Sequence, residues 1–183
     1  MSRPALFLDR DGVINIDFAY VYKPEQFEFI EGVFELCQWA SQCGYLIFVI
    51  TNQAGIGRGY YTEQDFLKLT DWMCGIFKTQ GSIITKVYFC PSHPEYGIGE
   101  YKVDSFFRKP GPGMILQAAE EFCVDLARSV LVGDKEKDIQ AGIAAGVGCN
   151  LLYHPDVNAR IETSATIAIS DLSAAQNYLA KID

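Results

Sequence analysis

The sequence predicts an α/β fold in which helices cover both faces of a central, mostly parallel sheet. Short apolar runs alternate along the chain with segments whose apolar residues recur at helical spacing, and this alternation is typical of parallel sheets. The run 45–50 is apolar throughout, as expected for a strand buried on both faces. The chain has 183 residues, of which 49% are hydrophobic, so we expect a single domain spanning residues 1–183.

Local signals place the individual elements. Thr62 is a good N-cap for a helix, Pro112 suits a first helical turn, and Gly44 and Gly146 are expected just after helix ends. We therefore expect helices that begin near residues 33, 62, 112 and 135, and a last helix over 173–181. The expected strands lie at residues 5–8, 45–50, 86–90, 130–132, 151–153 and 167–169.

Composition excludes several classes of function. The net charge is −8, from 15 basic and 23 acidic residues, and such a field repels a nucleic-acid backbone. No apolar run approaches the roughly 18 residues of a membrane span, and the N-terminus has no secretory pattern. The six cysteines are dispersed, with no C-x-x-C pair, which favours reduced thiols. We expect a cytoplasmic protein without a nucleic-acid or membrane partner.

Two segments are long for connections within a compact domain. Residues 10–32 and 91–112 each follow an expected strand and show little periodicity. Loops of this length are usually functional, and ligands of open α/β sheets bind beyond the carboxyl ends of the strands. We therefore expect both segments to contribute to substrate specificity.

Polar residues stand where the first two of these strands end. Asp9 and Asp11 follow the first strand, and two neighbouring carboxylates repel each other unless a cation such as Mg²⁺ lies between them. The alternative is a turn capped by aspartate. Thr51, Asn52 and Gln53 follow the second strand and could donate hydrogen bonds to an anion, although a self-contained turn would use the same residues.

Two further polar segments follow later in the chain. Arg108 and Lys109 form a basic pair, which by itself would indicate a solvated surface. Asp134 and Asp138 follow the fourth strand, and alone they would suit the acidic start of a helix. Taken in chain order, the four segments supply a carboxylate nucleophile, a second acid, a hydroxyl donor, a lysine and distal acids.

This order resembles the haloacid dehalogenase (HAD) superfamily of aspartate-nucleophile phosphatases. The superfamily motifs D-x-D-G-[TV], a Ser or Thr after the second strand, a Lys and G-D-x-x-x-D correspond to residues 9–13, Thr51, Lys109 and residues 133–138. The resemblance implies a three-layer Rossmann-like fold. The short chain leaves no room for a large cap domain.

Longer runs resemble one family within it, the D-glycero-D-manno-heptose 1,7-bisphosphate 7-phosphatases and the related histidinol phosphatases. The matching runs are 6–15, 27–32, 51–53, 55–59, 108–110 and 133–135, and the resemblance spans residues 5–153. It implies a monomeric, Mg²⁺-dependent enzyme that hydrolyses the 7-phosphate of this sugar through an aspartyl-phosphate, in the synthesis of nucleotide-activated heptose. The alternatives are a histidinol phosphatase, another small-molecule phosphatase of the superfamily or, more remotely, a non-catalytic binding protein.

The resemblance also implies roles for individual residues. Asp9 would be the nucleophile and Asp11 the general acid and base, while Thr51 and Lys109 would hold the phosphoryl oxygens. Mg²⁺ would be bound by Asp9, the Asp11 carbonyl and Asp134, with Asp138 as a supporting group. Arg108 could bind a second phosphate. Substrate would be bound by Asp17, Tyr20, Asn52, Gln53, Arg108 and Lys135.

The sequence departs from this family at a zinc loop that the family commonly carries before R-K-P. Cys90 and His93 retain part of a first ligand pair, whereas residues 104–107 contain no cysteine. Because two ligands do not close a tetrahedral site, we expect no structural zinc. We expect Cys90 and His93 to serve in packing and a local hydrogen bond, and Tyr101, Phe106 and Phe107 to pack the loop onto the body.

Overall fold

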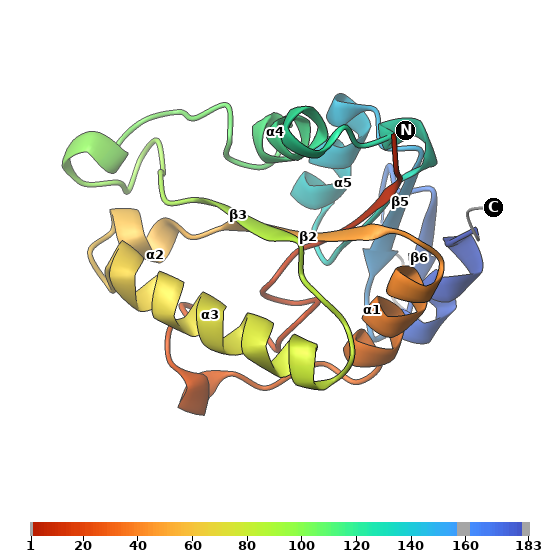
Figure 1. The fold of residues 1–183 in the computed structure, drawn as a ribbon. Helices are drawn as coiled ribbons and strands as arrows, with labels where there is room; N and C mark the ends of the chain where they lie inside the picture. Colours follow the sequence, from red (N-terminus) through yellow and green to blue (C-terminus); the bar gives the residue numbers. More distant parts are fainter. Residues whose placement is uncertain (1, 157–161, 181–183) are drawn as a thin grey trace.

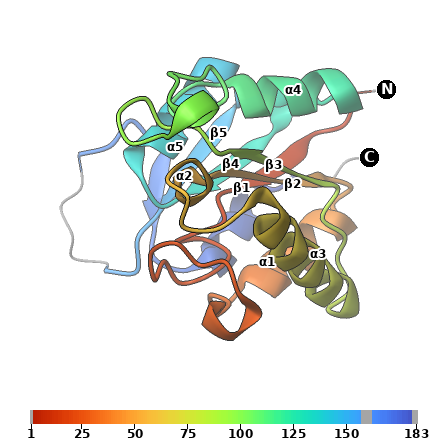
Figure 2. The ribbon, with the colours of Figure 1, turned by 90° about the vertical axis from the view of Figure 1, so that its left-hand side faces the viewer.

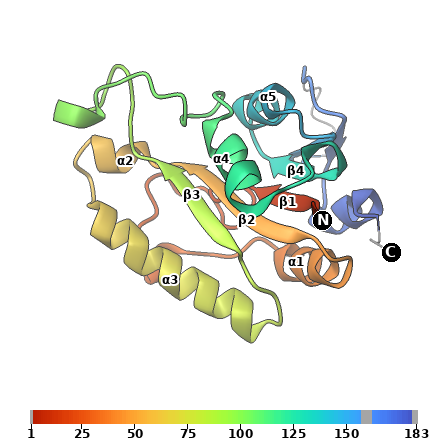
Figure 3. The ribbon, with the colours of Figure 1, turned by 45° about the horizontal axis from the view of Figure 1, so that its top comes forward.

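The computed structural model describes residues 2–156 and 162–180 and contains one six-stranded sheet in these ranges. The strand order is β3-β2-β1-β4-β5-β6, and every neighbouring pair is parallel (Figure 3). The predicted parallel α/β architecture is confirmed. The strands are β1 (Ala5–Leu8), β2 (Leu46–Asn52), β3 (Lys86–Cys90), β4 (Val130–Gly133), β5 (Cys149–Tyr153) and β6 (Ile167–Ile169).

Helices cover both faces of this sheet (Figure 1). One face packs its alternate strand residues against α1, α3 and the last 3₁₀ helix, η4, and the other face packs against α4 and α5. Because β1 sends successive residues to opposite cores, all four of its residues are buried. The helices are α1 (Val33–Gln42), α2 (Ala54–Gly57), α3 (Glu63–Thr79), α4 (Gly113–Phe122), α5 (Glu136–Ala145), η1 (Pro24–Gln26), η2 (Gly99–Tyr101), η3 (Leu126–Arg128) and η4 (Leu172–Tyr178).

The strand order reverses at β1, and this reversal places the candidate site. The chain runs outward from β1 through β2 to β3 and then returns to the other side of β1 at β4. Leu8 lies beside Val49 of β2 and Val132 of β4, and the Asp9 N–H extends the ladder to the Val132 carbonyl at 3.1 Å. Parallel sheets bind ligands in the crevice at such a switch point, so the loops after β1, β2 and β4 converge on one place.

Several predicted helix boundaries are confirmed. The Thr62 side chain accepts from the Asp65 N–H, and the Asp65 side chain accepts from the Thr62 N–H, which makes a complete capping box at the start of α3. Gly44 and Gly146 follow α1 and α5 with φ of 86° at both positions, the left-handed conformation that ends helices.

Strand β5 begins at Cys149, two residues before the expected start, and β4 ends one residue later than expected. Two other elements differ more. Strand β2 continues beyond residue 50, since Thr51 and Asn52 pair with Phe89 and Cys90 of β3. The last helix, expected over 173–181, is the 3₁₀ helix η4, in which the buried residues Leu172 and Ala175 repeat every three positions. Position 181 of that expectation lies outside the described residues.

The 91–112 loop is attached to the body through its main chain. The Ile98 N–H donates to the Gly57 carbonyl of α2 at 2.8 Å, and a Cβ on Gly57 would lie 2.4 Å from the Pro91 carbonyl oxygen. Figure 2 shows the loop (green) beside α2. The expectation that Phe106 and Phe107 pack this loop is wrong, because both side chains are exposed.

Local hydrogen bonds replace those aromatic contacts. The Phe106 carbonyl accepts from the Gly113 N–H at 3.1 Å, so a backbone bond secures the loop end at α4. Tyr101 does contact the body, where its hydroxyl donates to Glu63 of α3 at 3.0 Å. Across residues 2–156 and 162–180, no helix has the length and apolar character needed to cross a membrane.

We expect Thr62→Ala to lower the free energy of unfolding by about 1 kcal/mol, because the variant loses the capping box of α3. Urea denaturation measures the change. Thr79→Ala is the matched control, since the Thr79 hydroxyl only donates back to the Ile76 carbonyl near the exposed end of the same helix. A Thr62→Ala loss no larger than the Thr79→Ala loss would contradict the assignment.

Candidate active site

A polar cavity of about 290 Å³ lies beyond the carboxyl ends of β1 and β2. Most residues predicted from the sequence line it. Lys109 lies buried beneath it, and Asp134 lines an adjoining hollow that also contains Gly12. The lining residues are Asp9, Asp11, Asp17, Ala19, Tyr20, Thr51, Asn52, Gln53, Ala54, Gly55, Tyr61, Arg108, Lys135 and Lys137.

The Lys109 ammonium joins three segments at the floor of the site. Its Nζ lies 2.8 Å from Asp9 Oδ1 and 2.8 Å from Asp138 Oδ1, and it donates to the Ile50 carbonyl at 2.9 Å. Two carboxylates and one backbone carbonyl therefore surround the ammonium. Burial alone would lower the pKa of Lys109, but the Asp138 and Asp9 carboxylates outweigh burial and raise it.

Asp9 is buried next to two other acids. Burial, reinforced by the charges of Asp138 and Asp134, raises its pKa to about 7 even though Lys109 opposes the shift. Its Oδ1 accepts from the Arg10 N–H at 2.7 Å as well as from Lys109. No hydrogen bond from the described residues reaches Asp9 Oδ2.

The acids around Asp9 fit a divalent cation. One carboxylate oxygen from each of Asp9, Asp134 and Asp138 lies within 4.8 Å of the others. Asp134 Oδ1 is buried without a hydrogen-bond partner in the described part of the chain, and burial, with Asp138, raises the Asp134 pKa. Asp138 has both oxygens engaged, Oδ1 with Lys109 and Oδ2 with the Lys135 N–H at 3.0 Å. The carboxylates left for a hard cation are therefore Asp9 and Asp134, and carboxylates of this kind suit Mg²⁺.

Gly12 lets the 10–32 loop pass close to Asp134. Its φ is 99°, and a Cβ at this position would lie 2.2 Å from Asp134 Oδ2. Only glycine satisfies both the backbone angle and the close approach. On the other side of Asp134, Lys135 Nζ lies 3.1 Å from Asp134 Oδ2 and 3.0 Å from Asp17 Oδ2, so Lys135 links this loop to the end of β4.

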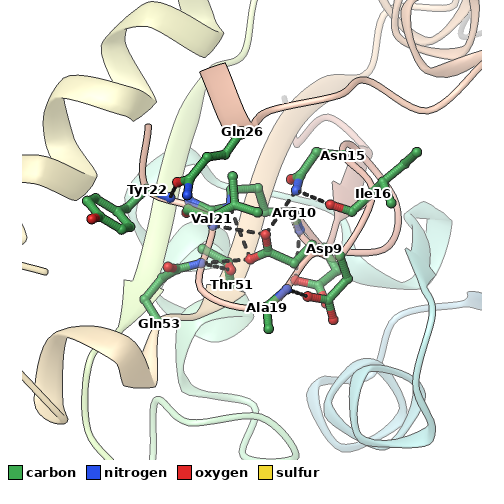
Figure 4. A network of polar contacts seen from close by, with 12 residues as sticks. Asp9, Arg10, Asn15, Ile16, Ala19, Val21, Tyr22, Gln26, Thr51 and Gln53 are labelled. Atoms are coloured by element: carbon green, nitrogen blue, oxygen red, sulfur yellow. Dashed lines mark hydrogen bonds and ion pairs between the residues drawn. The ribbon is translucent and has the colours of Figure 1, made fainter. Parts of the chain in front are cut away.

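Asp11 is held by four hydrogen bonds from Arg10, Asn15 and Gln53, whose side chains converge in Figure 4. Arg10 donates from Nε at 3.1 Å and from Nη2 at 2.9 Å, and the amide groups of Asn15 and Gln53 each donate at 3.0 Å. The Gln53 amide also donates to Thr51 Oγ1 at 2.8 Å, while its carbonyl accepts from Tyr61 at 2.5 Å. Gln53, predicted to bind substrate, thus orients the two predicted catalytic side chains.

Asn52 bonds to the backbone of the residue that carries the buried cation. Its amide donates to the Lys109 carbonyl at 3.0 Å, and its carbonyl accepts from the Lys109 N–H at 3.0 Å. Although Asn52 lines the cavity, both of its polar atoms are engaged in this reciprocal pair. We therefore propose that Asn52 positions Lys109, whereas the sequence assigned it to substrate binding.

The rim of the cavity is basic and aromatic. Arg108 donates from Nη1 to the Ser92 carbonyl at 3.0 Å, and burial, together with Arg58, lowers its pKa. The Arg58 guanidinium lies over the rings of Tyr96 and Tyr20, 4.4 and 5.9 Å from their centroids. Arg108 lines the cavity, and Arg58 lies near enough to Arg108 to lower its pKa. Together the two cations form a positive region beside the cavity that suits an anionic group; the sequence left Arg58 without a role.

Cys90 and His93, the residues of the incomplete zinc motif, have ordinary surroundings. Cys90 is buried in the core between the sheet and α4. His93 Nδ1 accepts from the backbone N–H groups of Glu95 and Tyr96, both at 3.2 Å. The expected packing of Cys90 and the expected local hydrogen bond of His93 are thus confirmed.

Sequence reasoning missed Arg10, Asn15 and Tyr61. Arg10 stands at the unspecified position between the two motif aspartates, so the motif gave no signal for it. Its only local signal was an arginine two residues after the end of an apolar strand that is buried at every position.

Comparisons with known proteins agree with this fold. A hydrolase family model described as HAD-hydrolase-like matches residues 106–176. A D-glycero-α-D-manno-heptose-1,7-bisphosphate 7-phosphatase of Burkholderia mallei is 59% identical over 92% of this chain and 89% of its own. A D-glycero-β-D-manno-heptose-1,7-bisphosphate 7-phosphatase of Vibrio cholerae is 44% identical over 100% of this chain and 99% of its own.

Solved structures are similar over nearly the whole chain. A HAD-like phosphatase of Mesorhizobium loti superimposes with a TM-score of 0.87 at 32% identity, covering 97% of this chain and 86% of the other. The D,D-heptose 1,7-bisphosphate phosphatase of B. bronchiseptica, complexed with magnesium and phosphate, gives a TM-score of 0.81 at 28% identity, covering 96% and 97%.

The sheet order, the buried aspartate at the switch point and these matches define a hydrolase of the HAD superfamily. Within it, the chain belongs to the D-glycero-D-manno-heptose-1,7-bisphosphate 7-phosphatase family, as the identity over almost its full length shows.

The raised pKa of Asp9 predicts how stability depends on pH and Mg²⁺. Between an ordinary value of 3.8 and about 7, metal-free folded protein keeps a proton on Asp9 that the unfolded chain has lost. Folded protein therefore binds more protons in this window, and Asp9 makes the free energy of unfolding fall as pH rises toward 7. Because Mg²⁺ binds the carboxylate form, the increase in Tm on adding Mg²⁺ should grow with pH across the same window.

Thermal unfolding with and without Mg²⁺ from about pH 5 to 8 measures this dependence. Asp9→Asn should abolish most of the Mg²⁺ effect and flatten its pH dependence. A Mg²⁺-induced rise in Tm of equal size at every pH would be inconsistent with the prediction.

Proposed function

We propose that this chain is a Mg²⁺-dependent phosphatase that removes the 7-phosphate of D-glycero-D-manno-heptose 1,7-bisphosphate through an aspartyl-phosphate. The observation that carries the proposal is the Asp9 carboxylate, which is fixed through Oδ1 at the floor of a polar cavity, while its Oδ2 accepts no hydrogen bond from residues 2–156 and 162–180. An anchored carboxylate next to a cation is the arrangement that a nucleophile needs. Family membership supplies the substrate class.

In the first half of the reaction, an Asp9 oxygen attacks the phosphorus of the 7-phosphate. The bond between phosphorus and the sugar oxygen breaks, and the electron pair stays on that oxygen, which takes a proton from the Asp11 carboxyl group. Thr51 Oγ1 lies at the cavity wall, where its hydroxyl can donate to a phosphoryl oxygen. A phosphoryl oxygen that contacted Lys109 would share that ammonium with Asp9 and Asp138.

In the second half, water attacks the phosphorus of the aspartyl-phosphate. Its proton passes to the Asp11 carboxylate, the bond to Asp9 breaks, and inorganic phosphate leaves. Asp9 and Asp134, with the Asp11 carbonyl, would hold Mg²⁺, and the bound ion would supply positive charge that lets a carboxylate approach a phosphate dianion. Asp11 lines the cavity, and because four donors fill the lone-pair sites of its carboxylate, one of these hydrogen bonds must open whenever Asp11 carries the proton.

The second phosphate of the substrate would lie at the rim. Arg108 and Arg58 are the cations there, and Arg108 lines the cavity. A monophosphate leaves them unused, whereas a bisphosphate neutralises them. Tyr20 and the Asp17–Lys135 pair would contact the sugar between the two phosphates.

Phosphate release from a substrate panel tests the assignment. With Mg²⁺, kcat/KM for one anomer of the heptose 1,7-bisphosphate should exceed that for histidinol phosphate by about 10²-fold or more. Both anomers are assayed, since relatives are named for each, and the ratio between them identifies the preferred one. Histidinol phosphate turned over as fast as either anomer would overturn the proposed substrate.

Loss of the buried cation should abolish most turnover. Lys109→Met is expected to lower kcat by about 10²-fold or more, because Asp9 then lacks its neutralising partner and the transition state lacks nearby positive charge. Lys86→Met is the control, since Lys86 pairs with Glu121 on the surface and should leave kcat unchanged. Equal kcat values for the two variants would refute the role of Lys109.

A further inference from the structure

Arg10 is a buried arginine placed directly after the nucleophile. Its side chain is only 2% exposed, and arginine is seldom fully buried unless it is paired with another group. Nη2 donates to the Val21 carbonyl at 2.8 Å as well as to Asp11, and the guanidinium carbon lies 5.6 Å from the centroid of the Phe66 ring. Figure 4 shows Arg10 next to the loop segment that contains Val21.

The contact between Arg10 and Asp11 is two-pronged. Nε donates to one carboxylate oxygen and Nη2 to the other, at 3.1 and 2.9 Å. A planar guanidinium that meets both oxygens fixes the plane of a carboxylate, which a single amide donor does not. Asn15 and Gln53 each add one bond, so Arg10 is the only charged group among the described donors to Asp11.

The same guanidinium supports the loop that faces the substrate. The bond to Val21 secures the end of the segment that carries Asp17 and Tyr20, both of which line the cavity. On the opposite side, Phe66 belongs to α3. One side chain therefore ties the acid, the substrate loop and the helix layer to each other.

We propose that Arg10 is a positioning residue that acts through Asp11. It orients the carboxyl group toward the leaving oxygen, and it stabilises the carboxylate that remains once the proton has moved to that oxygen. The inference rests on the aspartyl-phosphate mechanism proposed above. The bonds made and broken are those of its first half, in which the proton lost by Asp11 appears on the sugar hydroxyl.

This role makes a prediction that a merely structural arginine does not. A sugar alkoxide is a poor leaving group and needs the proton of Asp11, whereas 4-nitrophenolate leaves without one. The value of kcat/KM reports only the steps up to cleavage of the ester bond, so it isolates the half in which Asp11 is an acid. Loss of Arg10 should therefore reduce kcat/KM far more for the sugar phosphate than for 4-nitrophenyl phosphate.

The experiment compares kcat/KM on these two substrates for wild type, Arg10→Met, Arg10→Lys, Asp11→Asn and the double variant Arg10→Met/Asp11→Asn. We expect the sugar phosphate to lose about 10²-fold more than the aryl phosphate in Arg10→Met, with a smaller difference in Arg10→Lys, which keeps the charge but not the fork. The double variant should be no slower on the sugar phosphate than Asp11→Asn, because the two residues act as one unit.

Phe66→Leu is the matched control for disturbance of the same buried site. It removes the ring under the guanidinium and leaves the ion pair, so its effect should be similar on both substrates. Equal losses on the two substrates in Arg10→Met, or multiplicative losses in the double variant, would overturn the inference. Thermal unfolding checks the fold of each variant, and if Arg10→Met does not fold, the comparison between Arg10→Lys and wild type decides by the same criterion.

Failure of the proposed function gives a different result. If wild type does not hydrolyse the heptose bisphosphate, that substrate assignment fails. The ratio of kcat/KM for an alkyl phosphate to kcat/KM for 4-nitrophenyl phosphate is then measured with whichever alkyl phosphate the enzyme does hydrolyse. If wild type is active on the heptose bisphosphate and Arg10→Met has the same ratio as wild type, only the role of Arg10 fails.

Discussion

The buried ammonium of Lys109 is the interaction on which the rest of the site depends. Asp9 follows β1, Asp138 belongs to α5, and the Ile50 carbonyl lies within β2, so one side chain connects three parts of the fold. Removing one partner of a buried ion pair typically costs about 3–5 kcal/mol, because the remaining charge stays buried and uncompensated. The cluster of acids at the switch point is therefore tolerable only while Lys109 is in place.

That requirement explains why the end of the 91–112 loop is held so firmly. The Asn52 side chain, on β2, makes two hydrogen bonds to the backbone of Lys109, and the neighbouring Arg108 donates to the Ser92 carbonyl. The buried cation and the rim cation are consecutive residues. Any displacement of this short segment would change the environment of Asp9 and the charge at the rim together.

The strands were predictable because a strand buried on both faces is a continuous run of apolar residues. The four motif segments were predictable because polar residues follow such runs or match known motifs. Runs of apolar residues gave every strand of the sheet, and the polar residues that follow these runs indicated the edge of the sheet at which ligands bind. The strand order and its reversal at β1 were not predicted. Local patterning did not reveal that Thr51 and Asn52 continue β2, since polar residues at a strand end look like a turn. It also did not distinguish a 3₁₀ helix from an α-helix near residue 172, because that choice depends on which residues the core buries.

The contacts of single side chains were less predictable. Arg10 occupies a position that the motif leaves open, and only the folded chain brings it against Val21 and Phe66. Phe106 and Phe107 are large and apolar, yet both are exposed, since backbone bonds already secure the loop. Hydrophobicity alone therefore predicted the wrong support for the 91–112 loop.

The main-chain attachment of this loop separates two kinds of evolutionary change. The bond from Ile98 to Gly57, and the close approach of Gly57 to the Pro91 carbonyl, use no side chain of the loop itself. Exposed side chains such as Tyr96 and Phe106 can thus be exchanged while the loop keeps its path. Substitutions on the exposed face of this loop should therefore leave the reaction chemistry intact, provided that Gly57 persists.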